Sequence, residues 1–316
     1  MHEFAIIGCG TISKRHAENI SRIGKLVAVC DIIPARADEL AATYNAKAYY
    51  SIDDLLKQEK TISIVVVCSP NGFHAEHSIK SLQAEKNVLC EKPLCITSVA
   101  ASQVIDTAYF FRKKIVVVKQ NRFNPPVEFI KKALDSNQLG KVFSFQINCF
   151  WNRPQEYYKG DWKGTIELDG GILYTQFSHF IDLLYWFLGD VEEVKGIKAK
   201  YLKRKHVEIE DTGMAVLIMK NGATGTINYT VNTYNKNMEG SFTLFCEKGT
   251  VKIGGQYLNK LEWYETNDNQ KPVFEDAANA NDYGFYQGSM SNHHKVYENL
   301  LASMQGEGML PEAKDA

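Results

Sequence analysis

The chain has 316 residues and a formal net charge of −1, from 36 Lys and Arg against 37 Asp and Glu. A hydrophobic fraction of 45% and a charged fraction of 23% are typical of a folded globular protein of about two domains. These values exclude a disordered chain, and a charge so close to zero disfavours nucleic acid as a partner. Small molecules are the expected ligands.

The seven cysteines are scattered and form no C-x-x-C pair, which indicates reduced thiols in a cytoplasmic protein. No segment approaches the roughly 18 uninterrupted apolar residues of a membrane helix. The N-terminus also lacks the basic and apolar regions of a signal peptide. Secretion and membrane insertion are therefore disfavoured.

In the first 120 residues, short β-branched runs alternate with longer amphipathic segments. Continuous apolar runs predict parallel strands that are covered on both faces. The predicted strands are 4–7, 26–29, 47–50, 64–67, 87–89 and 115–118. A segment at 51–57 begins with Ser51 and Asp54 at a spacing that resembles a capping box. Six strands with intervening helices predict a doubly wound parallel sheet.

The pattern changes after Arg122. Helices are predicted at 124–135, 172–188 and 289–305. A long run at 142–151 precedes strand signals at 199–202, 213–219, 225–231, 241–246 and 250–253. Asn221-Gly222 and Lys248-Gly249 mark turns between them. This succession predicts a second domain of α+β type with an antiparallel or mixed sheet.

A glycine turn follows the first predicted strand and opens a helix: Gly8-Cys9-Gly10-Thr11-Ile12-Ser13. Gly8 permits a tight turn, and Gly10 lets a pyrophosphate approach the backbone at the helix N-terminus. Ser13 stands at the third glycine position as another small residue. Asp31, 21 residues beyond Gly10, can accept hydrogen bonds from a ribose 2′-hydroxyl and would repel a 2′-phosphate. The spacing predicts NAD as the cofactor rather than NADP.

A wider set of motifs resembles the Gfo/Idh/MocA family of oxidoreductases. The set comprises the glycine turn, Cys68-Ser69-Pro70-Asn71, His74, Glu91-Lys92-Pro93, Gly170-Gly171, His179 and Asp182. The resemblance implies a Rossmann domain at 1–121 and, at 122–316, a substrate-binding domain with an open-faced, mostly antiparallel sheet that packs in a homodimer or homotetramer. It implies that Lys92 lies beside the nicotinamide, with Pro93 often in a cis peptide. The implied cofactor-binding residues are Gly8, Gly10, Thr11, Ile12, Asp31, Ser69, Pro70, Asn71, His74, Glu91, Lys92 and Gln120.

Two side chains are candidates to accept a proton. Oxidation of a carbinol releases a hydroxyl proton, and a positioned His or a Lys of depressed pKa is the usual acceptor. Lys92 and His179 are the expected catalytic residues, and Asp182, three residues after His179, can orient the His179 ring or the helix end. The adjacent pair His293-His294 cannot both face one ion, and no metal is predicted.

A narrower resemblance covers Asn121 to Pro125 and Trp151 to Asp190. These segments are similar to enzymes that oxidise the 3″-hydroxyl of UDP-N-acetylglucosaminuronic acid for bacterial surface polysaccharides. Aromatic rings there can stack on sugar or uracil, and cations can pair with carboxylate or diphosphate. The expected substrate-binding residues are Lys92, Arg122, Asn124, Arg153, Tyr157, Tyr158, Trp162, Lys163, Thr175, Gln176 and His179. Lys163 stands where Arg is expected.

The leading hypothesis is NAD-dependent oxidation of a UDP-linked amino-sugar uronate at C3. Thr175 stands where inositol- and glucose-type members of the family commonly have Asp, which disfavours a simple polyol. Free sugar or inositol dehydrogenation and NAD-dependent glycoside cleavage remain alternatives within the family. A non-catalytic NAD-binding sensor is the alternative of another class.

Overall fold

The computed structural model describes residues 2–160, 162–267, 272, 274, 280–282, 284 and 287–306. The chain forms two compact units. The first comprises Met1–Val118, Glu167–Gly170 and His293–Ala316, and the second comprises Lys119–Ile166 and Gly171–Asn292. The first junction lies near the predicted boundary after residue 121. The chain then returns to the first unit twice, at Glu167–Gly170 and at His293–Ala316. The sequence predicted only one boundary between the two domains.

The first unit contains a six-stranded parallel sheet in the order β3-β2-β1-β4-β5-β6. Its strands are β1 (His2–Ile7), β2 (Gly24–Cys30), β3 (Lys47–Tyr49), β4 (Ile64–Val67), β5 (Asn87–Cys90) and β6 (Ile115–Val117). All four residues of β4 are buried, as expected for a strand covered on both faces. The predicted doubly wound sheet is confirmed.

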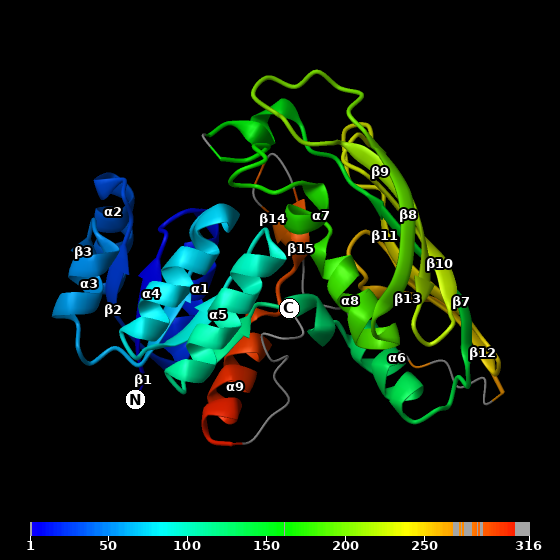
Figure 1. Cartoon of the computed structure of the whole chain (residues 1–316), viewed down its shortest axis with the longest axis horizontal. Coiled ribbons are helices and arrows are strands. Elements are labelled where there is room, and N and C mark those ends of the chain that lie inside the picture. Colours follow the sequence, from blue (N-terminus) through cyan, green and yellow to red (C-terminus); the bar gives the residue numbers. More distant parts are fainter. Residues whose placement is uncertain are drawn as a thin grey trace. The chain divides into compact units, whose positions relative to one another are not determined.

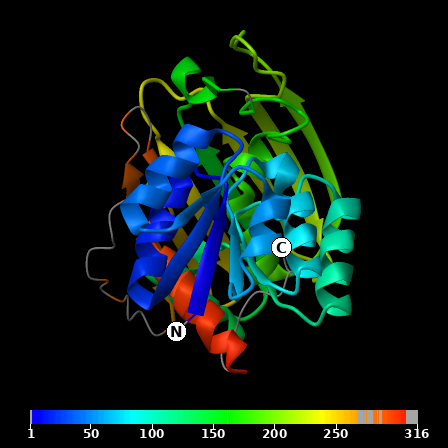
Figure 2. The same ribbon diagram turned by 90° about the vertical axis from the view of Figure 1, so that its left-hand side faces the viewer.

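Helices cover this sheet on both faces (Figure 2). They are α1 (Thr11–Ile23), α2 (Pro34–Tyr44), α3 (Ile52–Gln58), the 3₁₀ turn η1 (Asn71–Phe73), α4 (His74–Gln83), α5 (Ser98–Phe110) and α9 (His293–Met304). The Asp54 N–H donates to the Ser51 hydroxyl at 3.3 Å, so α3 begins as the capping pattern predicted. Helix α9 comes from the far end of the sequence, and the Tyr297 ring contacts Phe4 of β1 edge-on.

The second unit contains a seven-stranded sheet in the order β13-β12-β11-β7-β10-β9-β8 (Figure 1). Its strands are β7 (Val142–Phe150), β8 (Val191–Ala199), β9 (Thr212–Met219), β10 (Thr224–Thr230), β11 (Glu239–Cys246), β12 (Gly249–Gly254) and β13 (Lys260–Thr266). Only the β7–β10 pair is parallel among these strands. The predicted mixed, mostly antiparallel sheet is confirmed.

The remaining elements of this unit are short helices and one hairpin. They are η2 (Gln120–Phe123), α6 (Pro125–Asp135), η3 (Gln155–Tyr158), α7 (Ile172–Thr175), α8 (Ser178–Leu188), β14 (Ala280–Asp282) and β15 (Gln287–Met290). Helices α6 and α8 bury their apolar sides in the same core as the sheet. Alternate residues of β9 point away from this core: Met214, Val216 and Ile218 are 51%, 56% and 40% exposed. The sheet therefore presents an apolar outer face.

Three predicted elements differ from the structure. The helix expected at 289–305 begins only at His293, because residues 289 and 290 belong to strand β15, which pairs with β14. The single helix expected at 172–188 is two helices, because the Phe177 N–H bonds to the Ile172 carbonyl five residues back, at 3.0 Å. This wider turn directs Phe177 into the core against Trp151 and Phe180. The strand expected at 199–202 ends at Ala199, since the Tyr201 and Leu202 N–H groups donate to the buried Asp211 carboxylate.

No helix among the described residues has both the length and the apolar character needed to span a bilayer.

Removal of the Phe180 side chain tests the packing of α8. Phe180 is fully buried, so Phe180→Ala should lower the free energy of unfolding by about 3–5 kcal/mol. The neighbouring Ile181 is 38% exposed, and Ile181→Ala should cost about 1 kcal/mol or less. Chemical denaturation of both variants measures the difference, and equal costs would contradict the placement of α8.

Candidate active site

The turn after β1 is built around Gly8. Its φ of +92° is one that residues with a side chain rarely adopt. A Cβ atom here would lie 2.6 Å from the Ser69 nitrogen and 2.7 Å from the Cys68 carbonyl carbon. The Gly8 N–H donates to the Cys30 carbonyl at 2.8 Å. Position 8 therefore accepts only glycine, and the turn lies against the chain that leaves β4.

Gly10 has the opposite surroundings. A Cβ added to Gly10 would meet no atom within 4 Å. Gly10 precedes α1, which has no side-chain cap and no acidic residue in its first turn, where Thr11 and Ile12 lie. The buried Ser13 hydroxyl donates to the Gly10 carbonyl at 2.6 Å. Open space beside uncapped N–H groups suits the diphosphate of a dinucleotide.

Asp31 follows β2 directly and its carboxylate is fixed by the backbone. The Cys9 N–H donates to one oxygen at 2.7 Å, and the Ile33 N–H donates to the other at 2.8 Å. The first bond joins the carboxylate to the glycine turn. The negative charge thus has a defined place beside the turn, as ribose recognition requires.

The segment after β4 is held by the buried ring of His74. Its Nδ1 lies 2.6 Å from the Pro93 carbonyl oxygen and its Nε2 lies 2.8 Å from the Ser69 carbonyl oxygen. Burial lowers the pKa of His74, although both carbonyl groups favour the charged ring. Pro70 precedes η1, and the Asn71 amide donates to the Asp169 carbonyl at 2.9 Å. The ring of His74 therefore joins two of the predicted motifs.

The third motif of this unit follows β5. Glu91 is buried, Lys92 is half-buried, and the Lys92–Pro93 peptide is cis, as the resemblance implied. The Lys92 backbone N–H donates to Glu91 Oε2 at 3.1 Å. All the cofactor-binding residues predicted before Gln120 thus lie at the carboxyl ends of neighbouring parallel strands, where ligands bind in such sheets.

In the second unit, Arg122 and Asp182 form a buried ion pair. Arg122 Nε lies 2.9 Å from Asp182 Oδ2, and Arg122 Nη2 lies 2.6 Å from Asp182 Oδ1. Lys119 Nζ lies 3.3 Å from the same Oδ1. Asp182, which was expected to orient His179 or the helix end, therefore serves two cations. The expected role of Arg122 in substrate binding stays a prediction. Arg122 would have to contact the substrate while it remains paired with Asp182.

Four of the predicted substrate-binding residues meet in what we call the aromatic–basic cluster: Arg153, Tyr157, Lys163 and Gln176. Arg153 is 1% exposed and donates from Nε to Gln176 Oε1 at 2.8 Å. The Gln176 amide donates in turn to the Tyr157 hydroxyl. Arg153 and Lys163 lie over the Tyr157 ring, with Lys163 Nζ 4.0 Å from its centroid. The cluster combines cations with aromatic faces in one place.

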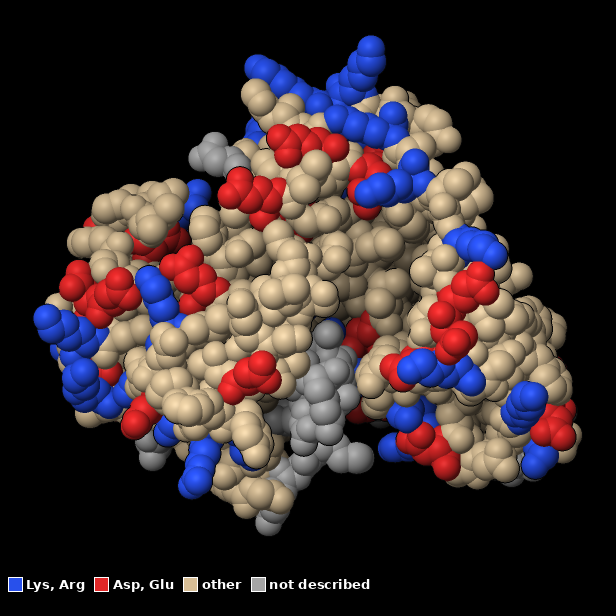
Figure 3. Space-filling model, viewed as in Figure 1, with Lys and Arg blue, Asp and Glu red and all other residues tan. Residues whose placement is uncertain are grey.

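The basic segment between β8 and β9 packs against η3, which carries Tyr157 of this cluster. Gln155, at the start of η3, exchanges two hydrogen bonds with the Lys205 backbone. The Arg204 guanidinium lies 5.7 Å from the ring centroid of Tyr158. Figure 3 shows Lys and Arg side chains gathered over this segment at the top of the view. This segment carries Lys203, Arg204 and Lys205 in succession, so its charge is positive.

The other predicted residues of the second unit lie outside this cluster, although the Trp162 ring contacts Lys163. The centroid of the Trp162 ring lies 5.8 Å from Lys163 Nζ. Thr175 is the last residue of α7, and His179 is buried in the first turn of α8. The Asn124 amide donates to the carbonyl groups of Tyr257 and Leu258, which fixes it within the fold. The Gln120 amide donates to the Ser289 hydroxyl at 2.9 Å, and the buried Gln120 Oε1 has no partner among the described residues.

Sequence reasoning missed three buried side chains that support Glu91: His16, His293 and Tyr297. His16 lies about one and a half turns into α1. The glycine motif therefore predicted the helix but gave no indication of a role for the His16 ring. The pair His293-His294 was noticed only as a metal candidate. Contacts between residues so far apart in the chain leave no local signal.

Comparisons with known proteins agree with this geometry. The family model described as an oxidoreductase family with an NAD-binding Rossmann fold, Gfo/Idh/MocA, matches residues 2–119. The model of the Gfo/Idh/MocA C-terminal domain matches residues 127–252. Together the two models cover more than half of the chain.

Three individual proteins illustrate the range of relatives. The crystal structure of the WlbA dehydrogenase from Chromobacterium violaceum, in complex with NADH and UDP-GlcNAcA, is 32% identical, with a TM-score of 0.88 over 99% of this chain and 89% of that chain. Glucose-6-phosphate 3-dehydrogenase from Bacillus subtilis is 29% identical over 63% of this chain and 57% of its own length. Inositol 2-dehydrogenase from Salmonella paratyphi B is 26% identical over 78% of this chain and 72% of its own length.

The matches confirm the predicted family, and the solved complex confirms the predicted similarity to the UDP-sugar branch. The cofactor prediction is confirmed as well, because the matched first domain is NAD-binding and the similar WlbA structure holds NADH. The chain belongs to the Gfo/Idh/MocA family and is an NAD-dependent oxidoreductase.

Proposed function

We propose that the protein oxidises C3 of a UDP-linked N-acetylamino-sugar uronate, in the synthesis of a bacterial surface polysaccharide. The observation that carries the proposal is the aromatic–basic cluster in a chain that aligns almost end to end with the WlbA dehydrogenase. A nucleotide-linked uronate offers a carboxylate, a diphosphate and flat rings. Cations over aromatic faces suit each of these groups.

The first unit supplies the cofactor site. The uncapped start of α1 and the open space beside Gly10 suit the diphosphate, and the fixed Asp31 carboxylate suits a ribose 2′-hydroxyl. Bound NAD supplies a hydride acceptor at its nicotinamide ring. In the second unit, the buried Oε1 of Gln120 is a hydrogen-bond acceptor that has no partner among the described residues.

Two residues of this chain are proposed for the proton. Oxidation of the C3 carbinol removes a hydride from carbon and a proton from the hydroxyl group, which leaves a ketone and reduced cofactor. Lys92 or His179 accepts that proton, and the Lys92 backbone is fixed by its bond to Glu91. In its protonated form the acceptor stabilises the partial negative charge that the oxygen carries until the hydride has left and the neutral ketone has formed.

Oxidation of an unlinked sugar or inositol is the second candidate. It is supported by the curated relatives, which include an inositol 2-dehydrogenase and a glucose-6-phosphate 3-dehydrogenase. The residue that separates the candidates is Thr175, which cannot supply the charge that an Asp gives at this position. A neutral polyol also has no charged group with which the cations of the aromatic–basic cluster could pair.

Substrate profiling with the purified protein tests the proposal. We expect NADH formation, or a 3-keto product by mass spectrometry if the cofactor stays bound, with UDP-N-acetylglucosaminuronic acid but not with myo-inositol or glucose 6-phosphate. Lys92→Ala should lower kcat by about 10²–10⁴ with little change in the NAD Kd. Lys57→Ala, on the exposed side of α3, is the matched control. Turnover of inositol in preference to UDP-sugars would refute the proposed substrate.

A pair of glycine substitutions tests the cofactor site. Gly8→Ala should lower the free energy of unfolding by about 1–3 kcal/mol, because its Cβ has no room and its φ is positive. Gly10→Ala should leave the stability of the cofactor-free protein nearly unchanged, since its Cβ enters open space, but should weaken NAD binding. Thermal denaturation and titration calorimetry separate the two effects. Unchanged NAD affinity in Gly10→Ala would place the diphosphate elsewhere.

We also propose that the apolar outer face of the second unit's sheet forms the contact of a homodimer or homotetramer. Ile197 of β8 and Met214 and Val216 of β9 share this face and are 69%, 51% and 56% exposed in the single chain. Such a patch on one face is typical of an interface between subunits. The cytoplasmic location also remains a prediction.

A charged substitution on this face tests the assembly. Light scattering after size-exclusion chromatography should give two or four chains for the unmodified protein. Val216→Glu should lower that number, because a buried carboxylate in the interface has no partner. Val99→Glu, at a 68% exposed position of α5, should not. A monomeric unmodified protein would rule the interface out.

A further inference from the structure

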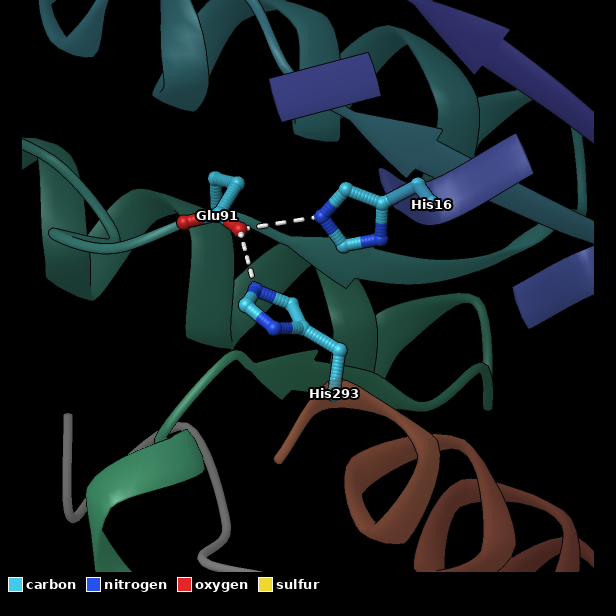
Figure 4. Close-up of side chains that lie close together, drawn as sticks. All are labelled: His16, Glu91 and His293. Atoms are coloured by element: carbon cyan, nitrogen blue, oxygen red, sulfur yellow. Dashed lines mark hydrogen bonds and ion pairs between the residues drawn. The ribbon is translucent and has the colours of Figure 1, made fainter. Parts of the chain in front are cut away.

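A buried polar group lies behind the Glu91-Lys92 turn, entirely within the first unit. It consists of His16 from α1, Glu91 after β5, and His293 and Tyr297 from α9, and we call it the Glu91 network. Each of the four residues is 7% exposed or less. Figure 4 shows both imidazole rings pointing at one carboxylate oxygen. Buried polar groups of this kind cost stability unless they are well partnered, so the arrangement requires an explanation.

Three hydrogen bonds of this network converge on the Glu91 carboxylate. The Tyr297 hydroxyl donates to His16 Nδ1 at 2.8 Å, and His16 Nε2–H donates to Glu91 Oε1 at 2.9 Å. The other carboxylate oxygen, Oε2, accepts the Lys92 backbone N–H at 3.1 Å. A neutral imidazole protonated at Nε2 satisfies every donor and acceptor in this series. The chain of bonds leads from α9 to the backbone of Lys92.

His293 adds a second contact on the same carboxylate. Its Nε2 lies 3.6 Å from Glu91 Oε1, and its ring meets that of His16 edge-on, with centroids 5.4 Å apart. Burial opposes ionisation of Glu91, but the hydrogen bond from His16 and the nearby His293 ring hold the pKa of Glu91 well below its usual range. The carboxylate is therefore an anion that is fixed from two helices.

The geometry favours direct hydrogen bonds over a bound metal ion. His16, Glu91 and His293 place their ligand atoms within 4.8 Å of one another, which is a spacing that an ion could bridge. Ligand atoms about 2.0–2.1 Å from a tetrahedral zinc ion lie roughly 3.3 Å apart. His16 Nε2 and Glu91 Oε1 are only 2.9 Å apart, which is an ordinary hydrogen-bond distance.

We propose that His16, His293 and Tyr297 are positioning residues for Lys92. They hold the Glu91 carboxylate, and its bond to the Lys92 N–H fixes the peptide plane from which the Lys92 side chain projects. Helix α9 thus supports the Glu91-Lys92 turn, although its first residue, His293, comes 201 positions after Lys92. The inference rests on the proposed role of Lys92 in catalysis.

The experiment compares two tyrosine substitutions in the holoenzyme. Tyr297→Phe removes the donor to His16 and keeps the ring packed, so the protein should fold. Tyr49→Phe is the matched control, since the Tyr49 hydroxyl also donates to a carboxylate, Glu59, at 2.6 Å, but from the edge strand β3. We expect Tyr297→Phe to lower kcat roughly tenfold with KM within about twofold, and Tyr49→Phe to leave both unchanged. Equal kcat values for the two variants would overturn the proposal.

Hydrogen exchange supplies a readout that needs no substrate. Pro93 has no backbone N–H, so a short proteolytic peptide that ends just after it reports the exchange of the Lys92 backbone N–H. This hydrogen should exchange faster in Tyr297→Phe than in Tyr49→Phe. Unchanged exchange would overturn the proposal even if kcat fell. Faster exchange in a protein that oxidises no sugar would instead refute the proposed function and leave the positioning role supported.

Elemental analysis and nitrogen NMR complete the test. Labelled His16 should carry its proton on Nε2, and a ring protonated only on Nδ1 would overturn the series of bonds. One equivalent of zinc in the purified protein, lost in His293→Phe, would also overturn it and identify a metal site. Absence of bound metal together with the Nε2 proton supports the hydrogen-bonded network.

Discussion

The close approach of two backbone segments controls the architecture of the cofactor unit. Gly8 leaves β1 so near the Cys68–Ser69 peptide that no Cβ atom fits between them. The same contact sets the start of α1, and through the Cys9 N–H it sets the Asp31 carboxylate. Strands β1 and β4 are the neighbours at which the order of the sheet reverses. One steric constraint at this point therefore decides where a dinucleotide can lie.

The second unit depends on a different interaction, which is electrostatic. Asp182 is buried with Arg122 and Lys119, and the removal of either sign of charge would leave an uncompensated ion in the core. Arg153 is held in a comparable way by neutral acceptors and aromatic rings. Under the proposed function, the cationic side chains that a sugar nucleotide would meet are thus largely fixed before it binds. Such preorganisation lowers the entropy lost on binding.

The elements with strong local patterns could be predicted from the sequence. The apolar run at 64–67 forms a strand with the predicted bounds. Ser51 makes the capping hydrogen bond that its spacing from Asp54 predicted. The division of the helix at 172–188 could not be predicted, because the extra residue at Phe177 is selected by its packing against Trp151 rather than by local propensity. The Arg122–Asp182 pair was missed for the same reason, since side chains 60 residues apart give no periodic signal.

Helix α9 gives the first unit an unusual order of assembly. The hydrogen bond between His16 and Tyr297 joins residues 281 positions apart, and the whole second unit is encoded between them. During synthesis, the parallel sheet leaves the ribosome long before the helix that completes it. The burial of the Glu91 carboxylate must therefore wait until nearly all of the chain has been made. The Glu91-Lys92 turn acquires its final support only after the second unit has had time to fold.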